Sequence, residues 1–275
     1  MSGANFSIIV TYESQYSPKL AYNPVTNQYL IVWTEGRFND VYGRLVNADG
    51  SLSGSEFPIS SAANHQVEPE IVYNPSSNQF LVVSYDDRLV ELDWDIYGQF
   101  VNSDGSLSGA NFPISTAMDD QSRPVVAYNS ADNQYLVVWQ DERNTDTGYD
   151  VYARVVNADG TMGGSDFPIS TDDAKQLAAD IAYAPASNRF LVVWEHGPVI
   201  YGRLVNADTT FAGPEFLVAP RKYTRTVIDP AVGYDPCTDP QKLDRSDSSH
   251  RICPKGEIQW QSDGNSHRSS RPRWC

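Results

Sequence analysis

The stretch Ala21-Tyr-Asn-Pro-Val-Thr-Asn-Gln-Tyr-Leu-Ile-Val-Trp33, with Asp40-Val-Tyr-Gly-Arg44 and Asn47-Ala-Asp-Gly50 behind it, decides the fold because it recurs along most of the chain. Successive copies start at Pro18, Pro69, Pro124, Ala179 and Pro230, with spacings of 51, 55, 55 and 51 residues. Periods of this length with four strand-like segments per copy are typical of a β-propeller, in which each repeat forms one blade. The sequence therefore predicts an all-β propeller.

Four segments of each copy predict four strands. The innermost strand is expected around residues 20–22, because its middle residue is small in most copies and the propeller axis is crowded. Residues 29–33 form a continuous apolar run, which indicates a strand buried on both faces. The third strand is expected at residues 41–46 and the outermost at residues 57–59, where Pro58 is tolerated because an edge strand can lack one N–H.

Two turns hardly change from copy to copy, residues 23–27 and residues 47–50 in the first copy, and both are rich in residues that favour tight turns. The other two connections vary in length and composition. Because strands alternate in direction, the constant turns lie on one face of the disc (the constant face) and the variable connections on the other (the variable face). Binding and catalysis concentrate in variable loops on a rigid scaffold, so we expect the functional site on the variable face.

The ring is expected to have five blades. Four copies are complete, and a fifth contributes only its first strand, Ala231–Tyr234. Near the N-terminus, Asn5–Ile8 matches the outer strand Asn111–Ile114. We therefore expect residues 1–236 to form a five-bladed β-propeller, with a fifth blade shared between the two chain ends and residues 1–17 supplying its outer strand. A start within a repeat indicates a piece of a longer protein, and an incomplete closing blade would expose strand edges that favour self-association.

Residues 237–275 break the repeat pattern. They hold all three cysteines, Cys237, Cys253 and Cys275, and are rich in Ser, Arg, Pro and Asp. This composition predicts a disordered, truncated or non-native tail, and the alternative is a small appendage joined by a Cys237–Cys253 bridge. An odd number of cysteines outside any CxxC pattern argues against a zinc or redox centre.

Composition disfavours several classes of partner. The formal net charge of −15 disfavours binding to nucleic acid or to an anionic membrane surface. No apolar run approaches the ~18 residues that a membrane-spanning helix needs, so membrane insertion is not expected. No signal peptide is visible at the N-terminus.

Carboxylates recur where strands end on the variable face. Acids that close the second strand or open the third are Glu35, Asp86, Asp141, Asp40, Asp95 and Asp150. Because they recur from copy to copy, we expect them to pair with loop donors or arginines and to serve the fold. The alternative is bound Ca²⁺, a cation that prefers carboxylate oxygens, with Asp93 and Asp95 as the best local ligands.

The residue before each innermost strand differs from copy to copy and is expected to ring the mouth of the central channel: Ser17, Glu68, Arg123, Ala179 and Asp229. Two acids and an arginine converging there predict a glycosidase-like site with Glu68, Asp229 and Arg123 as catalytic residues. Glycoside hydrolysis needs one carboxylic acid to protonate the leaving oxygen and one carboxylate as base or nucleophile, ~5–9.5 Å apart. The alternative is that these are ordinary solvated loop charges.

Further side chains of the variable face are predicted to contact substrate: His65, Trp94, Asp119, Asp120, Asp172, Asp173 and His196. Trp94 lies in the longest acidic loop and can stack on a sugar ring or, equally, pack on a neighbouring blade. Ser84 replaces the tryptophan of the other copies, which predicts space beneath that loop. A histidine with Ser and Asp would also suggest a hydrolytic triad, but no G-x-S-x-G motif supports one.

The repeat Tyr-Asn-x4-Asn-Gln-Tyr/Phe-Leu-Val-Val-Trp, followed by Asp-Val/Ile-Tyr-Gly-Arg and Asn-Ala-Asp-Gly, resembles propeller repeats of large secreted or surface bacterial proteins. The resemblance covers residues 1–236 and implies a secreted or cell-surface protein engaged in adhesion or glycan contact. A second similarity, of fold only, is to five-bladed glycoside hydrolases acting on furanosides and plant polysaccharides, whose acids line the central cavity. Only Asp229-Pro230 looks like one of their positions, and similarity of fold does not establish activity.

Three functions are consistent with these features. A carbohydrate-directed propeller fits the acidic, variable face, and hydrolysis through Glu68 and Asp229 is its specific form. A non-catalytic glycan-binding, adhesion or structural module fits the regular repeat without any catalytic acid. A structural propeller stabilised by Ca²⁺ is the third.

Overall fold

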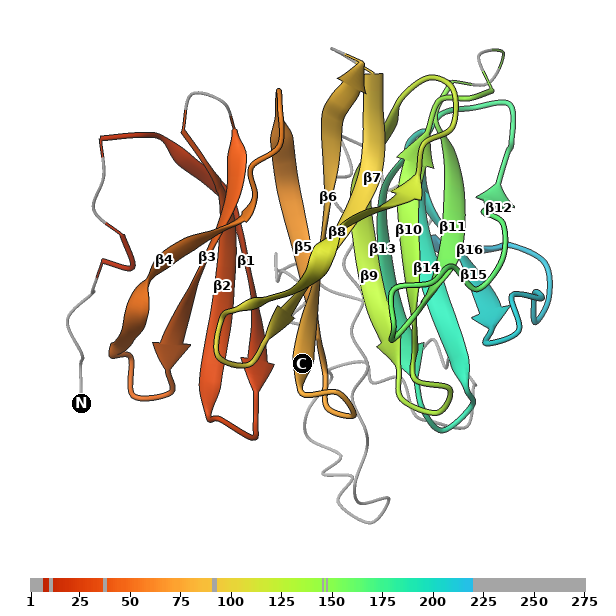
Figure 1. The fold of residues 1–275 in the computed structure, drawn as a ribbon. Helices are drawn as coiled ribbons and strands as arrows, with labels where there is room; N and C mark the ends of the chain where they lie inside the picture. The colour runs from red at the N-terminus through yellow and green to blue at the C-terminus, as the bar shows by residue number, and fades with distance from the viewer. Residues whose placement is uncertain are drawn as a thin grey trace, which may run out of the picture.

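The computed structural model describes residues 7–9, 12–36, 39–90, 93–144, 146 and 148–219. Within them, strands alone form four antiparallel four-stranded sheets that stand side by side in chain order, and each sheet is one blade (Figure 1). Blade 1 contains β1 (Gln15–Asn23), β2 (Gln28–Glu35), β3 (Asp40–Asn47) and β4 (Leu52–Ser60). Blade 2 contains β5 (Gln66–Asn74), β6 (Gln79–Val90), β7 (Asp93–Asn102) and β8 (Leu107–Ser115). Blade 3 contains β9 (Gln121–Asn129), β10 (Gln134–Asp141), β11 (Asp150–Asn157) and β12 (Phe167–Ser170), and blade 4 contains β13 (Gln176–Ala184), β14 (Arg189–His196), β15 (Val199–Asn206) and β16 (Phe216–Ala219).

The four sheets confirm the predicted all-β propeller architecture, with one repeat per blade. The β1–β2 and β5–β6 turns project from one end of the sheets, whereas β2 ends and β3 begins at the opposite end, so the sheets have two distinct faces (Figure 1). Asp229, the fifth copy at Ala231–Tyr234 and the tail at 237–275 lie outside the described residues. A count of five blades therefore stays a prediction.

Each innermost strand begins earlier than predicted, at Gln15, Gln66, Gln121 and Gln176, and contains a register shift. Beside each shift one residue has a positive φ: Ser17 (52°), Glu68 (47°), Arg123 (52°) and Ala178 (48°). This is a β-bulge, in which one extra residue on the bulged strand interrupts the pairing and re-aims a side chain. The bulge corrects the predicted rim position in blade 4, which is Ala178 rather than Ala179. The bulge also explains why the innermost strands were predicted to start too late, because one extra residue interrupts the two-residue alternation from which strands are predicted.

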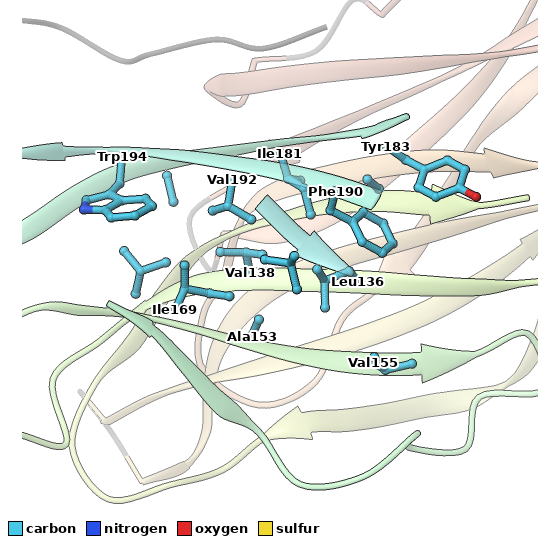
Figure 2. Packing of buried hydrophobic residues seen from close by; sticks show 14 residues of the cluster. Leu136, Val138, Ala153, Val155, Ile169, Ile181, Tyr183, Phe190, Val192 and Trp194 are labelled. Atoms are coloured by element: carbon cyan, nitrogen blue, oxygen red, sulfur yellow. The ribbon is translucent and has the colours of Figure 1, made fainter. Parts of the chain in front are cut away.

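Three apolar clusters form the core, and each lies between consecutive blades. The cluster between blades 3 and 4 packs Val138 and Ile169 against Val192 and Trp194 (Figure 2). Close approach also explains the Tyr-Gly pair of the third strand, because a Cβ added at Gly43 would lie 2.7 Å from Ile59 Cδ1. The second strands are accordingly the most buried part of each blade, as their apolar runs predict.

A hydrogen-bonded asparagine network links the blades at the constant face. Asn23 donates to Asn78 of the next blade at 2.9 Å, and Asn74 donates to Asn133 at 3.0 Å. In every described blade the innermost tyrosine donates to the last asparagine of its own turn: Tyr22 to Asn27, Tyr73 to Asn78, Tyr128 to Asn133 and Tyr183 to Asn188. These asparagines all have positive φ, which asparagine tolerates better than most residues.

Among the described residues, no helix has the length and apolar character required to cross a membrane.

Candidate functional site

The bulges of blades 2 and 3 bring two predicted site residues together on the variable face. Arg123 Nε lies 4.0 Å from Glu68 Oε2, and the two side chains are 54% and 40% exposed. The Tyr85 hydroxyl donates a hydrogen bond to the Glu68 carboxylate. Tyr16 of blade 1 completes this group, because Glu68 is close enough to raise the Tyr16 pKa after the larger effect of burial. A guanidinium group, a carboxylate and two phenols from three blades therefore lie on one rim.

Aromatic rings extend the group along blade 2. Trp94 meets Tyr85 edge-on, with ring centres 4.9 Å apart, and the His65 ring lies 6.2 Å from the Trp94 ring. Burial strongly raises the pKa of Tyr85, with Glu68 adding to the increase and Arg123 opposing it. Tyr85 is therefore neutral at physiological pH and able to donate its hydrogen bond.

His65 is held by a carboxylate that sequence reasoning missed. Asp87 is fully buried, and its Oδ2 lies 3.1 Å from His65 Nδ1. Asp87 Oδ1 also accepts the backbone N–H of His65 at 2.6 Å. This pair fixes the orientation of the imidazole and leaves Nε2 as its outer nitrogen. The only signal in the sequence was the doubled acid Asp86-Asp87.

The predicted loop acids divide among the blades. Asp120 Oδ1 accepts the Trp94 backbone N–H at 3.2 Å, so it belongs with the rim residues. Burial raises the pKa of Asp93, and Asp120 and then Asp119 raise it further, which places these three acids near one another. We call the set Tyr16, His65, Glu68, Tyr85, Trp94, Asp120 and Arg123 the mouth cluster.

Two other predicted residues form a separate group in blade 4. His196 Nδ1 lies 3.6 Å from Asp172 Oδ2, and both groups affect the pKa of Glu215. Asp173 is exposed beside them. The sequence alone could not show that these residues lie apart from the mouth cluster, because the distance between the two groups depends on how the blades are placed.

Three of the strand-end acids, Glu35, Asp86 and Asp141, pair within the fold as predicted. Asp141 accepts the Trp139 indole N–H at 2.8 Å and pairs with Arg143 at 2.6 Å. Asp86 pairs with Arg88 in the same way. Ser84, which replaces the tryptophan of the other copies, is buried in blade 2.

The calcium prediction finds no support. Asp95 faces Asp86 across the β6–β7 pair, and burial, followed by Asp93 and Asp86, raises the pKa of Asp95 to about 7. In the part of the chain that the structure describes, no three His, Cys, Asp or Glu side chains are placed to share a metal ion.

The innermost strands contribute charged residues that the sequence analysis did not identify. Lys19 of β1 and Glu70 of β5 form an ion pair. Burial raises the pKa of Glu70, while Lys19 lowers it and Asp180 of β13 raises it. Each residue stands two positions after a bulge residue, so the repeat could have identified them once the bulge was known.

A shallow cavity of ≈730 Å³ lies between blades 3 and 4 at the constant face, lined by Asp132, Gln134, Val155, Gly163, Asn188, Asn206, Ala207, Asp208 and Thr209. Two of the residues that line the cavity are hydrogen-bonded to each other, with Asn188 donating to Asp132 at 3.1 Å. The cavity therefore belongs to the asparagine network rather than to the mouth cluster.

No protein-family model and no curated protein matches the chain. A thermostable family-43 glycoside hydrolase has a similar structure, with a TM-score of 0.50, 12% identity, and coverage of 78% of each chain. A family-43 β-1,3-galactosidase with galactodeoxynojirimycin gives a TM-score of 0.50, 8% identity, and coverage of 74% of this chain and 76% of that one. Hydrazine synthase of Kuenenia stuttgartiensis gives 0.50 and 11%, with coverage of 69% and 52%. At these identities the similarity establishes the β-propeller fold, which proteins of unrelated activity share.

Proposed function

We propose that the mouth cluster binds a carbohydrate and that the specific activity is glycoside hydrolysis. The observation that carries this proposal is the grouping of aromatic rings, a carboxylate and an arginine on one rim: Tyr85, Trp94, Glu68 and Arg123. Sugars present apolar C–H faces and hydroxyl groups together. Rings pack on the former, and carboxylates and guanidinium groups hydrogen-bond the latter.

The solved structures with a similar fold support a carbohydrate as the ligand class. One is a family-43 β-1,3-galactosidase with galactodeoxynojirimycin. Their low identity transfers no residue and no linkage to this chain. A polysaccharide panel that includes β-1,3-galactans and furanosides is therefore the appropriate set of ligands.

For hydrolysis, Glu68 and Asp229 are the proposed carboxylates, and Arg123 is the residue that binds and orients substrate beside Glu68. Asp229 corresponds in the repeat to the bulge position of a fifth blade. One carboxylic acid would protonate the departing oxygen, and the other carboxylate would attack the sugar or activate water. Tyr85 is close enough to Glu68 for that carboxylate to raise the Tyr85 pKa, so the phenol and the carboxylate face the same bound sugar.

The test combines binding and turnover on the purified protein. We expect Trp94→Ala to weaken polysaccharide binding about tenfold, the loss of ~1.4 kcal/mol of stacking. Glu68→Gln should abolish release of reducing sugar and leave the melting temperature unchanged, because Glu68 is partly exposed. The control is Asp104→Asn, which removes one charge from an exposed turn of the constant face. Full turnover in Glu68→Gln would exclude Glu68 from catalysis.

A non-catalytic glycan-binding or adhesion module is the second candidate. It is favoured by the direct pairing of Glu68 with Arg123, since an acid that is already paired can recognise hydroxyl groups without transferring a proton. Tight binding without turnover across the panel would select this function. Either function fits the secreted or cell-surface location that the repeat implies.

The proposed ring has five blades, and two observations support closure by both chain ends. Leu20 of β1 is 59% exposed, whereas its equivalent in blade 2, Ile71, is 9% exposed against blade 1. Arg154 and Arg203 each donate to an outer-strand isoleucine carbonyl of the preceding blade, Ile114 and Ile169. Arg44 of blade 1 donates in the same way to the carbonyl of Ile8, the residue aligned with those isoleucines.

A ring left open at the same edge would associate through β1. Light scattering on the full chain distinguishes the two states, because closure predicts a monomer and an open edge predicts a concentration-dependent dimer.

A further inference from the structure

Blade 3 carries an arginine-centred contact at the variable end of its second strand. Arg143, two residues after Asp141, donates to Asp141 at 2.7 and 2.6 Å and to Asp166 at 2.6 Å. Its guanidinium carbon lies 4.2 Å from the centre of the Tyr152 ring. We call this contact the arginine clasp: a guanidinium group held between carboxylates and stacked on a tyrosine.

Blade 2 has a similar contact at the same position, in which an amide oxygen replaces the second carboxylate. Arg88 pairs with Asp86, lies 3.9 Å above the Tyr97 ring, and donates to Ser60 at 3.2 Å and to Asn111 Oδ1. The equivalent arginine of blade 1, Arg37, lies outside the described residues. Two of the described blades therefore place a guanidinium group at this position.

Blade 4 keeps the surroundings of the clasp but not its arginine. Pro198 stands two residues after His196, at the position that Arg143 has in blade 3, and His196 itself stands at the position of Asp141. Tyr201 pairs with Trp194 across the strands as Tyr152 pairs with Trp139.

The second carboxylate of the clasp is also kept. Glu215 precedes the outer strand of blade 4 as Asp166 precedes that of blade 3, and Ser170 corresponds to the Ser60 that Arg88 contacts. Blade 4 therefore has no arginine at this position, but it keeps a carboxylate, a hydroxyl and a tyrosine ring, with the His196 ring 5.4 Å from that of Tyr201.

Two buried nitrogen atoms near this position have no hydrogen-bond partner. Trp194 is fully buried, yet its indole N–H donates to nothing in the described residues, whereas Trp139 donates to Asp141. The indole nitrogen lies on the edge of the ring directed away from the apolar cluster (Figure 2). His196 Nδ1 is also without a hydrogen bond there, since Asp172 at 3.6 Å is too distant. Buried polar groups are rarely left unsatisfied, so a ligand that carries an acceptor fits this place.

Two carboxylates, Glu215 and Asp172, place negative charge around this position, which favours a cation. Burial raises the pKa of Glu215 and Asp172 raises it further, whereas Ser170, Arg203 and His196 lower it. The Glu215 side chain is 20% exposed, so it can be reached from solvent. A second carboxylate, Asp172, lies beside it and is 55% exposed.

Arg203 does not replace the missing arginine. Its Nη1 lies 3.3 Å from Glu215 Oε1, but its guanidinium carbon lies 3.5 Å above the Phe211 ring rather than over Tyr201. It also donates to the Ile169 carbonyl, as Arg154 donates to Ile114 in blade 3, where Arg143 is present as well. Arg203 is therefore the second, structural arginine of the repeat.

We propose that the variable end of blade 4 binds the arginine side chain of a polypeptide. The guanidinium group takes the place of Arg143, between Glu215 and Asp172 and over the Tyr201 ring. The adjacent peptide carbonyl accepts the N–H of Trp194. The arginine is supplied by a partner or by this chain's own basic segment 221–225, which holds Arg221 and Arg225.

The experiment follows the indole N–H signals of the full ¹⁵N-labelled chain by NMR. The chain has 6 tryptophans, and Trp194→Phe assigns the relevant signal. The probe is N-acetyl-argininamide, which carries a guanidinium group and peptide carbonyls. We expect a saturable shift of the Trp194 signal with a Kd on the order of 1 mM, and no shift of the Trp139 signal.

Controls separate this site from general attraction to an acidic protein. The uncharged isostere N-acetyl-citrullinamide should give no shift, and Glu215→Gln should weaken the arginine response at least tenfold. Asp159→Asn, an equal loss of charge in an exposed turn of the constant face, should leave the response intact.

If the chain's own arginine fills the site, the probe will give no shift. The Trp194 signal will then move in an Arg221→Gln, Arg225→Gln variant. The absence of both responses, or an equal response to citrulline, would overturn the proposal.

Discussion

The same hairpins build both faces of the disc. On the constant face the same side chains recur from blade to blade, whereas on the variable face only the backbone conformation recurs. On the constant face, every described blade forms the same tyrosine-to-asparagine hydrogen bond. On the variable face, the bulge residues share φ angles of 47–52° but are Ser17, Glu68, Arg123 and Ala178. The constant face therefore stabilises the fold, and the variable face is the one proposed to bind a ligand. Substitutions on the two faces should change stability and ligand binding separately.

The largest expected effect on the free energy of unfolding is an exception to this division, because Asp141 lies on the variable face and yet stabilises the fold. Asp141→Ala leaves the Trp139 N–H and the Arg143 guanidinium without their buried partner. The free energy of unfolding should fall by about 3–5 kcal/mol in urea denaturation. His196→Ala, at the same position of blade 4, should cost less than about 1 kcal/mol because no clasp is present there. Equal losses would show that the clasp is not a stabilising contact.

On the constant face, the asparagine network should be sensitive. Asn74 is fully buried, donates to Asn133 and Tyr135, and accepts the Ser76 N–H at 2.8 Å. Asn74→Ala should lower the free energy of unfolding by about 2–3 kcal/mol, because several buried groups lose their partners. Asp104→Asn in the exposed turn nearby should change it by less than about 0.5 kcal/mol. A small loss in Asn74→Ala would mean that the network orders the turns without stabilising them.

The pH dependence of the free energy of unfolding tests the role of Asp95 on the variable face. Its pKa is raised from 3.8 to about 7, so the folded state binds a proton more tightly than the unfolded state between these values. Stability should therefore decrease as pH rises from 5 to 7, by about 2 kcal/mol, and level off above the folded-state pKa. Asp95→Asn cannot ionise, so its unfolding free energy should exceed that of the wild type at pH 8 and converge toward it at low pH. A pH-independent difference between the two proteins would contradict the raised pKa.

The smallest effect on stability belongs to the rim. Glu68→Gln should change the free energy of unfolding by less than about 0.5 kcal/mol, since its partners Arg123 and Tyr85 keep an acceptor oxygen. Carbohydrate binding or turnover should nevertheless be lost. A large destabilisation would place Glu68 among the residues that serve the fold, and the proposed division between faces would fail there.

Much of the architecture could be predicted because the repeat multiplies every local signal. Apolar runs such as residues 29–33 identified the buried second strands, and recurrence of Asp86 and Asp141 indicated that these acids pair within the fold. Adjacent strands in each repeat pair locally, so sequence spacing determines which strands are neighbours.

The bulge could not be predicted, because one inserted residue changes the register without any residue type that announces it. Ser17, Glu68 and Arg123 are not glycine, the residue expected at positive φ. Two contacts were also missed: Lys19 with Glu70, which joins blades 1 and 2, and His65 with Asp87 within blade 2. The partners lie 51 and 22 residues apart in the sequence, and the first contact depends on the angle between two sheets.

The repeated bulge has a consequence for how such a protein can acquire new ligands. A left-handed conformation costs a non-glycine residue roughly 1–2 kcal/mol, and this fold already bears that cost with serine, glutamate, arginine and alanine alike. The main chain thus accepts small, acidic and basic side chains at one place without rearrangement. Diversification of the rim needs only single codon changes, and a combinatorial library at residues 17, 68, 123 and 178 would sample new specificities on an unaltered scaffold.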